Sequence, residues 1–535
     1  MDVSLNNTDL SVALDSISAE SILEHIKTLA SDEFEGRLPG SVGEDLTADY
    51  LIKKCRELGF QPCDPSGEYF QPVPAIGMKA QPSLTFHANG NALDLSFPDQ
   101  YVAMSYCHKP EVAIDDTEVV FVGYGIIAPE YDWNDYKNID VRGKMIVMLV
   151  GDPRRPDADD PSQLDQSFFR GNAMTYYGRW TYKYETAAQL GAAGALIVHD
   201  TEMAGYSFDV VKNSWSGENF DLDVEDENAL DVAGWISTET ARKVFAQSGL
   251  NFDQLKEAAQ HADFKPVRLE SKTSMRIVNT IRRFVSKNII AVLPGSDPVL
   301  KKECIIFSAH WDHFGRTADG VFSGAIDNGS GVACVLETAK AISKLKEAPR
   351  RSIVLFFSTL EESSLLGAKY YVEHPYFPLE NTVAIINLDV MNVWGRTRKV
   401  VSIAQGHSSL DEILEDCAQQ QNRSITSDPE PEKGCFYRSD HVEFLRRGVP
   451  AIFFLHPGED YIGQSPDFGE MKRLDYLQNA YHKVQDKVKP DWDLSGTVED
   501  VQLIFLAGLK ISEASRRPEW KAASEFKNAG KTPAR

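Results

Sequence analysis

The chain has 535 residues and a formal net charge of −24 at pH 7, because 79 acidic residues outnumber 55 basic ones. Hydrophobic residues make up 42% of the sequence and charged residues 25%, which is typical of a folded globular protein and excludes global disorder. A surface this acidic repels phosphate backbones, so we expect no nucleic-acid partner. No apolar run reaches the roughly 18 residues of a membrane-spanning helix, so we also expect no membrane span.

The first predicted elements are two helices within residues 17–60, joined by a loop. Glycines and a proline in Glu35–Gly43 interrupt the helical periodicity, which predicts an exposed loop there. In the segment that follows, Leu46 and Leu51 recur near helical spacing and Gly59 supplies an end. Residues 1–8 have neither a basic segment nor an apolar core, so we expect that a secretory leader is absent or has been removed.

From about residue 110 to 270 the pattern changes to short strand-like runs separated by long polar loops. The runs cover residues 119–125, 144–150 and 195–199. This change of composition predicts a separate, β-rich domain.

The seven cysteines of the chain include no C-x-x-C pair, which excludes a zinc-ribbon or thioredoxin-like site.

From about residue 275 onward, strand-like runs alternate with helical segments. The runs are almost continuously apolar, as in strands buried on both faces, and cover residues 288–293, 305–308, 353–357, 383–386 and 451–455. Apolar residues between Val332 and Leu345 fall on one face of a helix, and Ser330 can cap its start. The alternation predicts a mostly parallel sheet between two layers of helices.

Metal-type ligands follow three successive strands of this half. In open α/β sheets, ligands gather at the carboxyl ends of the strands, so these side chains should lie at one edge. They follow the second, third and fourth runs as His310-Trp-Asp312, then Glu361-Glu362, then Asn387-Leu-Asp389, while Asp327 precedes the helix in Gly324-Ala-Ile-Asp-Asn-Gly-Ser-Gly331.

A set of histidine and carboxylates without thiolates favours zinc, and bridging carboxylates allow two cations to share one site. Two metals can clamp both an attacking hydroxide and a scissile carbonyl oxygen. A carboxylate outside the ligand set is still needed to take the proton of the water. The adjacent pair Glu361 and Glu362 could divide these roles, one as ligand and one as base. Both residues would also be favourable at the start of a helix without any catalytic role, because the helix dipole stabilises acidic side chains there.

These motifs resemble those of the family-28 metallopeptidases, which include bacterial leucyl aminopeptidases, glutamate carboxypeptidase II and glutaminyl cyclases. The family pattern is H-x-D, G-A-x-D-N-x-S-G, E-E, N-x-D and a late aromatic-His pair, which Tyr481-His482 matches, with Asp486 following it. Similarity extends to Glu35-Gly-Arg-Leu-Pro-Gly40 and to Arg438-Ser-Asp-His441. The middle segment, from about residue 110 to 270, resembles a protease-associated domain, notably at Gly143-Lys144 before a strand and at Ala187-Ala-Gln-Leu-Gly-Ala-Ala-Gly194.

The resemblance implies two Zn²⁺ ions per chain. His310 and Asp389 would bind one ion, Glu362 and His482 the other, and Asp327 would bridge them. His441 and His456 compete with His482 for the last position, but the Tyr-His-x-x-x-Asp context favours His482. We expect His313 to lie beside the ligands, because the set is complete without it.

The resemblance also implies three residues with catalytic roles. Glu361 would be the general base, Asp312 would fix the tautomer of His310 by accepting its other ring N–H, and Tyr481 would donate to the developing oxyanion. Residues that could line a substrate pocket are Arg438, Asp440 and His441. Arg438 is either a clamp for a substrate carboxylate or a surface cation.

The expected fold is a three-layer α/β zinc-exopeptidase fold with a mostly parallel mixed sheet and an inserted β-rich protease-associated domain. The predicted segments are 15–110 and 273–520 for the peptidase domain and 111–272 for the insert. We expect a zinc-dependent aminopeptidase acting on peptides, in a periplasmic or secreted location, with the cytoplasm as the alternative. A carboxypeptidase of the glutamate carboxypeptidase type, a glutaminyl cyclase and a receptor-like scaffold without activity are the other possibilities; the oligomeric state is not indicated.

Overall fold

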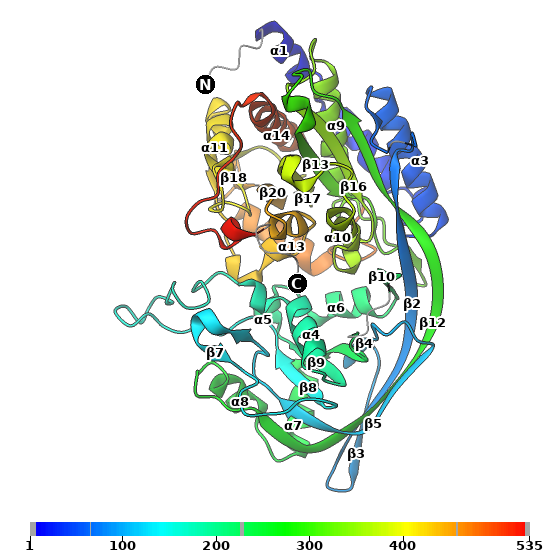
Figure 1. The fold of residues 1–535 in the computed structure, drawn as a ribbon, viewed down its shortest axis with the longest axis vertical. Helices are drawn as coiled ribbons and strands as arrows, with labels where there is room; N and C mark the ends of the chain where they lie inside the picture. The colour runs from blue at the N-terminus through cyan, green and yellow to red at the C-terminus, as the bar shows by residue number, and fades with distance from the viewer. Residues whose placement is uncertain (1–6, 65, 225–228, 456–457, 530–535) are drawn as a thin grey trace. The chain divides into compact units, whose positions relative to one another are not determined.

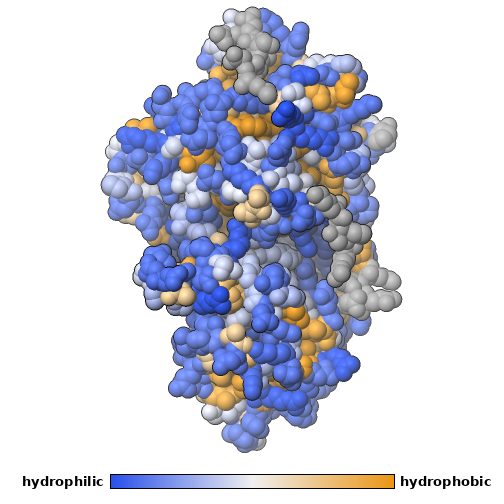
Figure 2. All heavy atoms as spheres, turned by 60° about the vertical axis from the view of Figure 1, so that its left-hand side comes forward, coloured by the Kyte–Doolittle hydropathy of each residue, from blue (hydrophilic) through white to orange (hydrophobic). Residues whose placement is uncertain are grey.

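The computed structural model describes residues 7–64, 66–224, 229–455 and 458–529. Contacts divide the chain into two units: the first comprises Met1–Val73, Val285–Pro429 and Arg438–Arg535, and the second comprises Pro74–Phe284 and Glu430–Tyr437. Within the described ranges, no helix combines the length and apolar character that a membrane span requires. Figure 2 shows a face on which hydrophilic side chains predominate and apolar ones form separate patches, as the acidic composition leads one to expect.

The first unit is built around a mixed sheet whose centre is parallel. β13 pairs in parallel with both β16 and β17, β17 pairs in parallel with β20, and β12 pairs antiparallel with β16. The bounds are β12 (Val267–Leu293), β13 (Cys304–His310), β16 (Ser352–Ser358), β17 (Thr382–Asp389) and β20 (Ala451–Leu455). The structure therefore confirms the five predicted strands, and the carboxyl ends of β13, β16 and β17 lie at one edge.

Helices cover both faces of this sheet, which gives the predicted three-layer α/β architecture (Figure 1). Along β13, Ile305 and Phe307 face an apolar core that α9 and α14 close. On the opposite face, Phe356 of β16 contacts the rings of Tyr371 and Phe444, which belong to α10 and α12. The bounds of the helices are α2 (Ala19–Leu29), α3 (Val42–Glu57), α9 (Gly329–Ser343), α10 (Leu366–Glu373), α11 (Leu410–Gln420), α12 (His441–Arg446), α13 (Phe468–Asn479) and α14 (Ser495–Glu513).

The N-terminal cap of α9 differs from the predicted one. Asn328, and not Ser330, is the capping residue, and its side-chain oxygen accepts the N–H of Gly331 at 3.0 Å. Ser330 already lies inside the helix, where its hydroxyl donates to the carbonyl of Ile326 at 2.6 Å. Asparagine is as good a cap as serine, so the sequence pattern alone did not separate the two.

The second unit contains a block of parallel strands, in the order β5, β8, β9 and β11. Apolar residues alternate between its two faces, and helices cover both: α4 and α6 close one core, and α7 and α8 close the other. The unit thus contains helices that the β-rich expectation did not include. The bounds are β2 (Phe70–Ala88), β3 (Asn91–Leu95), β4 (Tyr101–Met104), β5 (Glu111–Phe121), β8 (Met145–Leu149), α4 (Trp180–Gln189), β9 (Gly194–His199), α5 (Thr201–Ala204), α6 (Phe208–Trp215), β10 (Glu218–Leu222), β11 (Val232–Ser237), α7 (Thr238–Gln247) and α8 (Phe252–Ala258).

The limits of this unit, Pro74 and Phe284, differ from the predicted 111 and 272. Both limits fall inside long strands, because β2 has 19 residues and β12 has 27. A strand that continues from one unit into the next shows no break in composition, so a change of sequence texture did not mark the boundary.

Candidate metal centre

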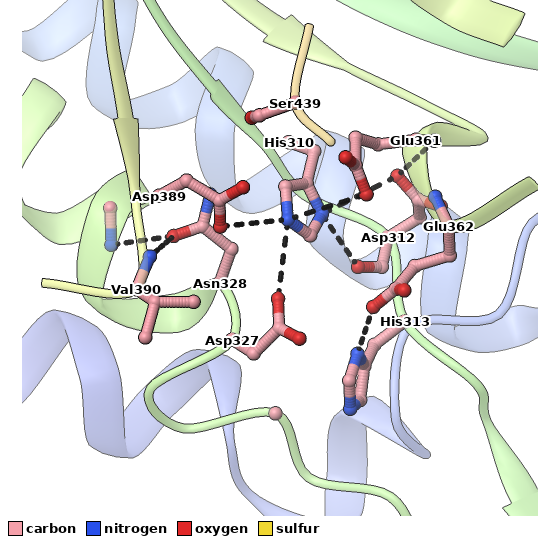
Figure 3. A network of polar contacts seen from close by, with 12 residues as sticks. His310, Asp312, His313, Asp327, Asn328, Glu361, Glu362, Asp389, Val390 and Ser439 are labelled. Carbon is pink, nitrogen blue, oxygen red and sulfur yellow. Dashed lines mark hydrogen bonds and ion pairs between the residues drawn. The ribbon is translucent and has the colours of Figure 1, made fainter. Parts of the chain in front are cut away.

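The predicted ligands His310, Asp327, Glu362 and Asp389 meet at the carboxyl edge of the sheet in the first unit (Figure 3). His310 is the last residue of β13 and Asp389 is the last residue of β17. Glu361 and Glu362 lie in a short helical turn that follows β16. His310 is 1% exposed and Asp389 6%, so these polar side chains need partners within the protein or a bound cation.

The first group of donor atoms surrounds Nε2 of His310. This nitrogen lies 3.3 Å from Oδ1 of Asp327 and 3.3 Å from Oδ1 of Asp389. Oε2 of Glu361 lies slightly farther away, at 3.7 Å. Dashed lines in Figure 3 join Asp327 and Asp389 to the imidazole from two sides.

The second group surrounds Nε2 of His482. This nitrogen lies 3.2 Å from Oε2 of Glu362 and 3.4 Å from Oδ2 of Asp327. Asp327 therefore offers Oδ1 to the first group and Oδ2 to the second, which is the arrangement of a bridging carboxylate. We name the two groups the His310 set and the His482 set; both contain Asp327.

These distances fit zinc. Ligand atoms that lie about 2.0–2.1 Å from a tetrahedral ion are about 3.4 Å from one another, and the distances of 3.2–3.4 Å from each imidazole nitrogen to its two nearest carboxylate oxygens match this separation. The donor chemistry, imidazole nitrogen with carboxylate oxygen, is also that of zinc sites. The residues present therefore fit two zinc ions, one held by each set.

The charge in the centre is unbalanced without cations. Burial alone would lower the pKa of an imidazole, yet the surrounding carboxylates raise the pKa of His310 well above its usual value. Glu362 likewise raises the pKa of His482 to about 9, against the effect of burial. The carboxylates thus stabilise the protonated, positively charged forms of both imidazoles. A divalent cation bound by the neutral rings can supply the same positive charge in place of these protons.

The two adjacent glutamates have opposite electrostatic environments. Burial, together with the carboxylates of Asp389 and Glu362, raises the pKa of Glu361 well above its usual value. Burial opposes the ionisation of Glu362 as well, but His482 and His313 lower its pKa to about 2. Glu361 is therefore the carboxyl that readily holds a proton, and Glu362 is the one that stays anionic, as a ligand must.

Asp312 takes a different partner from the predicted one. Its carboxylate lies 3.9 Å from Nδ1 of His310, and the nearer acceptor for that nitrogen is the backbone oxygen of Asp312, at 3.3 Å. The carboxylate instead accepts the backbone N–H groups of Glu361, at 3.1 Å, and Glu362, at 3.4 Å. These donors need an acceptor because Leu360, just before them, has a left-handed φ of 57° that aims the following backbone away from the strand ladder.

Asp486 positions the bridging carboxylate. Its Oδ1 accepts the N–H of Ile326 at 2.9 Å, and its Oδ2 accepts the N–H of Asp327 at 3.0 Å. The hydroxyl of Tyr476 donates to Oδ2 as well, at 3.2 Å. The acidic residue that the family pattern places after His482 therefore holds the loop that carries Asp327.

Arg37 is a supporting residue that sequence reasoning missed. The loop that contains it was predicted to be exposed, but Arg37 is 1% exposed. Its guanidinium donates to the carbonyl oxygens of Leu29, Trp311, Ser323 and Gly324, at 2.7–3.0 Å. It thus joins the end of β13 to the loop before Asp327. Glycines and a proline around it predicted a loop, and the similarity of Glu35–Gly40 to the family motif was the sequence signal that could have marked this loop as more than an exposed connection.

Two residues predicted for a substrate pocket, Asp440 and His441, are buried, and their role in such a pocket stays a prediction. Asp440 and His441 are both 0% exposed. Asp440 accepts a hydrogen bond from the hydroxyl of Ser358, and the ring of His441 stacks on Phe453 with centroids 4.0 Å apart. His441 is the first residue of α12, and its ring packs against β20 through Phe453. Arg438 is half-buried, and its role stays a prediction.

The ring of Tyr481 lies 3.9 Å from that of His482, centroid to centroid. This contact places Tyr481 beside the His482 set, while its role as an oxyanion donor stays a prediction. His456, a competitor for the position of His482, lies outside the described residues.

Comparison with known proteins relates this chain to peptidases. It is 32% identical over 120 residues to a vacuolar membrane protease of Vanderwaltozyma polyspora, covering 22% of this chain and 12% of that protein. It is 30% identical over 192 residues to leupeptin-inactivating enzyme 1 of Streptomyces exfoliatus, covering 34% of this chain and 39% of that protein. The chain thus matches well under two thirds of the length of either relative.

A solved structure, the aminopeptidase from Aneurinibacillus sp. strain AM-1, shares the fold, with a TM-score of 0.53 and 17% identity over 93% of this chain and 95% of that one. Residues 288–506 match peptidase family M28, and this range contains both donor sets. The match confirms the resemblance that the motifs suggested. The chain therefore carries a domain of peptidase family M28 at residues 288–506.

Proposed function

We propose that the protein is a zinc-dependent aminopeptidase that uses two zinc ions. The observation that carries this proposal is the pair of donor sets joined by Asp327, whose two oxygens lie 3.3 Å from His310 and 3.4 Å from His482. When bound, the two ions would supply Lewis acidity, which acidifies water and polarises a peptide carbonyl.

Within this proposal, Glu361 is the general base. Its carboxyl lies next to the His310 set, 3.7 Å from Nε2 of His310, and its raised pKa lets it accept a proton from the attacking water and return it to the leaving amine. Tyr481, beside His482, would donate a hydrogen bond from its hydroxyl to the developing oxyanion.

An N-terminal substrate suits the charge of the centre better than a C-terminal one. The buried carboxylates of the two donor sets, together with Asp312, Asp440 and Asp486, outnumber the nearby imidazoles. The guanidinium of Arg37 is bound to backbone carbonyls and is not free to receive a carboxylate. Two bound Zn²⁺ ions would offset the charge of the ligand carboxylates, and the buried acidic groups that remain, Asp312, Asp440 and Asp486, favour a substrate ammonium group, as in an aminopeptidase. The half-buried Arg438 is the residue that would favour the carboxypeptidase alternative.

The test compares two sets of peptides after zinc reconstitution. Peptides with a free N-terminus and an amidated C-terminus should be shortened from the N-terminus. Peptides with an acetylated N-terminus and a free C-terminus should remain intact. Cleavage of the second set alone would establish the carboxypeptidase, and cleavage of neither by a chain that holds two zinc ions would contradict exopeptidase activity.

We also propose that the second unit is a protease-associated domain and that the enzyme is exported. The support is the resemblance of the middle segment, notably at Gly143-Lys144, which directly precede β8, and at Ala187–Gly194, which ends at the first residue of β9. Fractionation of cells of the native host tests the location: the protein should be found in the periplasm or the medium, and recovery from the cytoplasm would contradict export.

A further inference from the structure

His313 lies beside the His482 set without belonging to it. Its Nδ1 is 2.6 Å from Oε1 of Glu362, and the residue is 1% exposed. Figure 3 shows the ring below the glutamate, with this contact as its dashed line. Glu362 is an anionic acceptor, so Nδ1 must carry the proton of this short hydrogen bond.

The two oxygens of Glu362 therefore have separate partners. Oε1 accepts from His313, and Oε2 faces Nε2 of His482 at 3.2 Å, in the position of a metal ligand. A carboxylate with one oxygen engaged in a charge-assisted hydrogen bond offers a cation only the other oxygen. With this hydrogen bond from His313, Glu362 can bind a metal through one oxygen; without it, both oxygens could bind.

The ring of His313 is fixed in place. Its backbone N–H donates to the carbonyl of Arg37 at 3.2 Å. Gly324 packs against its edge so closely that a Cβ there would lie 2.7 Å from Cδ2 of the imidazole. The ring of Phe314 contacts it with centroids 4.9 Å apart. A ring held on several sides can orient a carboxylate, because it cannot follow the carboxylate when that group turns.

The second nitrogen of the ring makes no compensating contact. Nε2 of His313 is buried and has no hydrogen-bond partner among the described residues. Buried polar atoms in proteins are nearly always paired, so a histidine that served packing alone would be expected to satisfy both nitrogens. The bond to Glu362 is thus the one polar contact of this ring among the described side chains.

We propose that His313 is a positioning residue that holds Glu362 as a one-oxygen ligand and thereby sets the zinc affinity of the His482 set relative to that of the His310 set. The inference rests on the proposed two-zinc function. Partners of metal ligands typically contribute 10–100-fold in metal affinity, and this hydrogen bond should have an effect of that size. Glu362 without it would be free to turn and to offer both oxygens.

The test uses two amides that place a donor at different positions. In His313→Asn, the side-chain amide nitrogen stands near the position of Nδ1 and can still donate to Glu362. In His313→Gln, it stands near the position of Nε2 and cannot. Competition with a chromophoric chelator, starting from metal-free protein, gives the two zinc affinities of each variant. His313→Gln should weaken one site about 10–100-fold, whereas His313→Asn should keep both sites within about threefold of the unmodified protein.

His25→Gln is the matched control. His25 is another buried histidine of the first unit, and its Nδ1 lies 2.6 Å from the hydroxyl of Tyr50. Its substitution also removes a short hydrogen bond but should leave both zinc affinities unchanged. A second control places His313→Gln in a Glu362→Gln background, where it should cause no further loss of affinity. Additive losses in that background would show that His313 acts through another group and would overturn the inference.

The outcomes separate the inference from the function on which it rests. Two zinc ions in the unmodified protein with equal affinities in both His313 variants would overturn the role of His313 and leave the two-zinc proposal standing. Fewer than two zinc ions in the unmodified protein would refute both. If both variants fail to fold, ¹⁵N-histidine spectra of the zinc-loaded unmodified protein decide the matter: the proton of His313 should reside on Nδ1, and an Nε2–H tautomer would overturn the proposal.

Discussion

Each unit of the protein buries ionisable groups, but it satisfies them differently. In the second unit, Lys183 is 0% exposed and donates to the carbonyl oxygens of Tyr124, at 2.5 Å, and Gly151, at 2.8 Å. Nearby, Asp152 accepts both the backbone N–H and the hydroxyl of Thr175, at 2.7 and 2.6 Å. In the first unit, by contrast, carboxylates of both donor sets converge on two imidazoles.

The difference lies in the balance of charge. Around Lys183, the acidic neighbours Asp152 and Asp135 accept backbone N–H groups of Thr175 and Ile126, and Arg154 is a second cation beside Asp152. At the metal centre, acidic groups exceed basic ones, and the excess can be offset by a bound cation. A buried group whose partners all belong to the protein is expected to serve stability, and one whose partners are insufficient is expected to serve a ligand. Four experiments test this contrast.

The largest expected effect is on catalysis by the two glutamates. Glu361→Gln should keep both zinc ions and lose roughly 10²–10⁴-fold in kcat with little change in KM, because it removes a proton acceptor without removing a ligand. Glu362→Gln should weaken one zinc ion instead, and added zinc should partly restore activity. Metal content measured beside kcat decides the matter. Because Glu361 also lies within ligand distance of His310 and Asp389, loss of zinc from Glu361→Gln would reverse the two roles.

Lys183→Met should affect stability and leave the metal centre alone. Removing one partner of a buried charge pair leaves the other uncompensated, which typically costs about 3–5 kcal/mol. We expect a loss of this size in denaturant unfolding monitored on the second unit, with zinc content unchanged. If the variant lost zinc or kept its full stability, the proposed contrast between the two buried groups would fail.

Removal of zinc should lower the stability of the first unit. A ligand that binds only the folded state stabilises it by about 2.7 kcal/mol at 100 times its dissociation constant, and by about 4.1 kcal/mol at 1,000 times. Thermal melting before and after chelation, at fixed free zinc, measures this contribution. An unchanged melting temperature would mean that the excess carboxylates are satisfied without a metal. Re-addition of zinc should restore the original value.

The smallest expected effect concerns His25, a buried group of the first unit whose partners belong to the protein. Burial, reinforced by Lys54 and Lys340, lowers its pKa from 6.5 to about 4. Between these two pKa values the unfolded chain binds a proton that the folded chain does not. The free energy of unfolding is therefore highest above pH 6.5 and falls as the pH falls toward 4. The stability of the unmodified protein relative to His25→Gln should therefore fall by about 1–3 kcal/mol over this range. An equal pH dependence for both proteins would contradict the assignment.

The sequence predicted the parts of the centre that depend on strands. His310, Asp389 and the glutamate pair follow almost continuously apolar runs, and the parallel pairing of β13, β16 and β17 brings them to one edge. Their identity as ligands came from residue type and order. Residue type and order along the chain are local features, and they can be interpreted without knowledge of the packing.

What the sequence did not predict depends on backbone conformation. The carbonyl of Asp312, rather than its carboxylate, approaches His310 because the chain turns back after β13. The carboxylate of Asp312 accepts the backbone N–H groups of Glu361 and Glu362 instead. These two residues follow Leu360, whose left-handed conformation is uncommon for a leucine. The guanidinium of Arg37 is buried among four carbonyl groups, of which those of Trp311, Ser323 and Gly324 come from a distant part of the chain. None of these contacts has a signature in residue spacing.

The position of Arg37 limits how far this domain can be reduced. The range matched to family M28, 288–506, holds every donor of the two sets but excludes Arg37 and the helices on either side of it. A minimal fragment cut to that range would retain every ligand and lose the guanidinium that ties Trp311 to Ser323 and Gly324. Recombinant versions of this protein should therefore begin before α2, because the ligands depend for their alignment on a segment that lies more than 250 residues upstream of the nearest of them in the chain (Arg37 to His310).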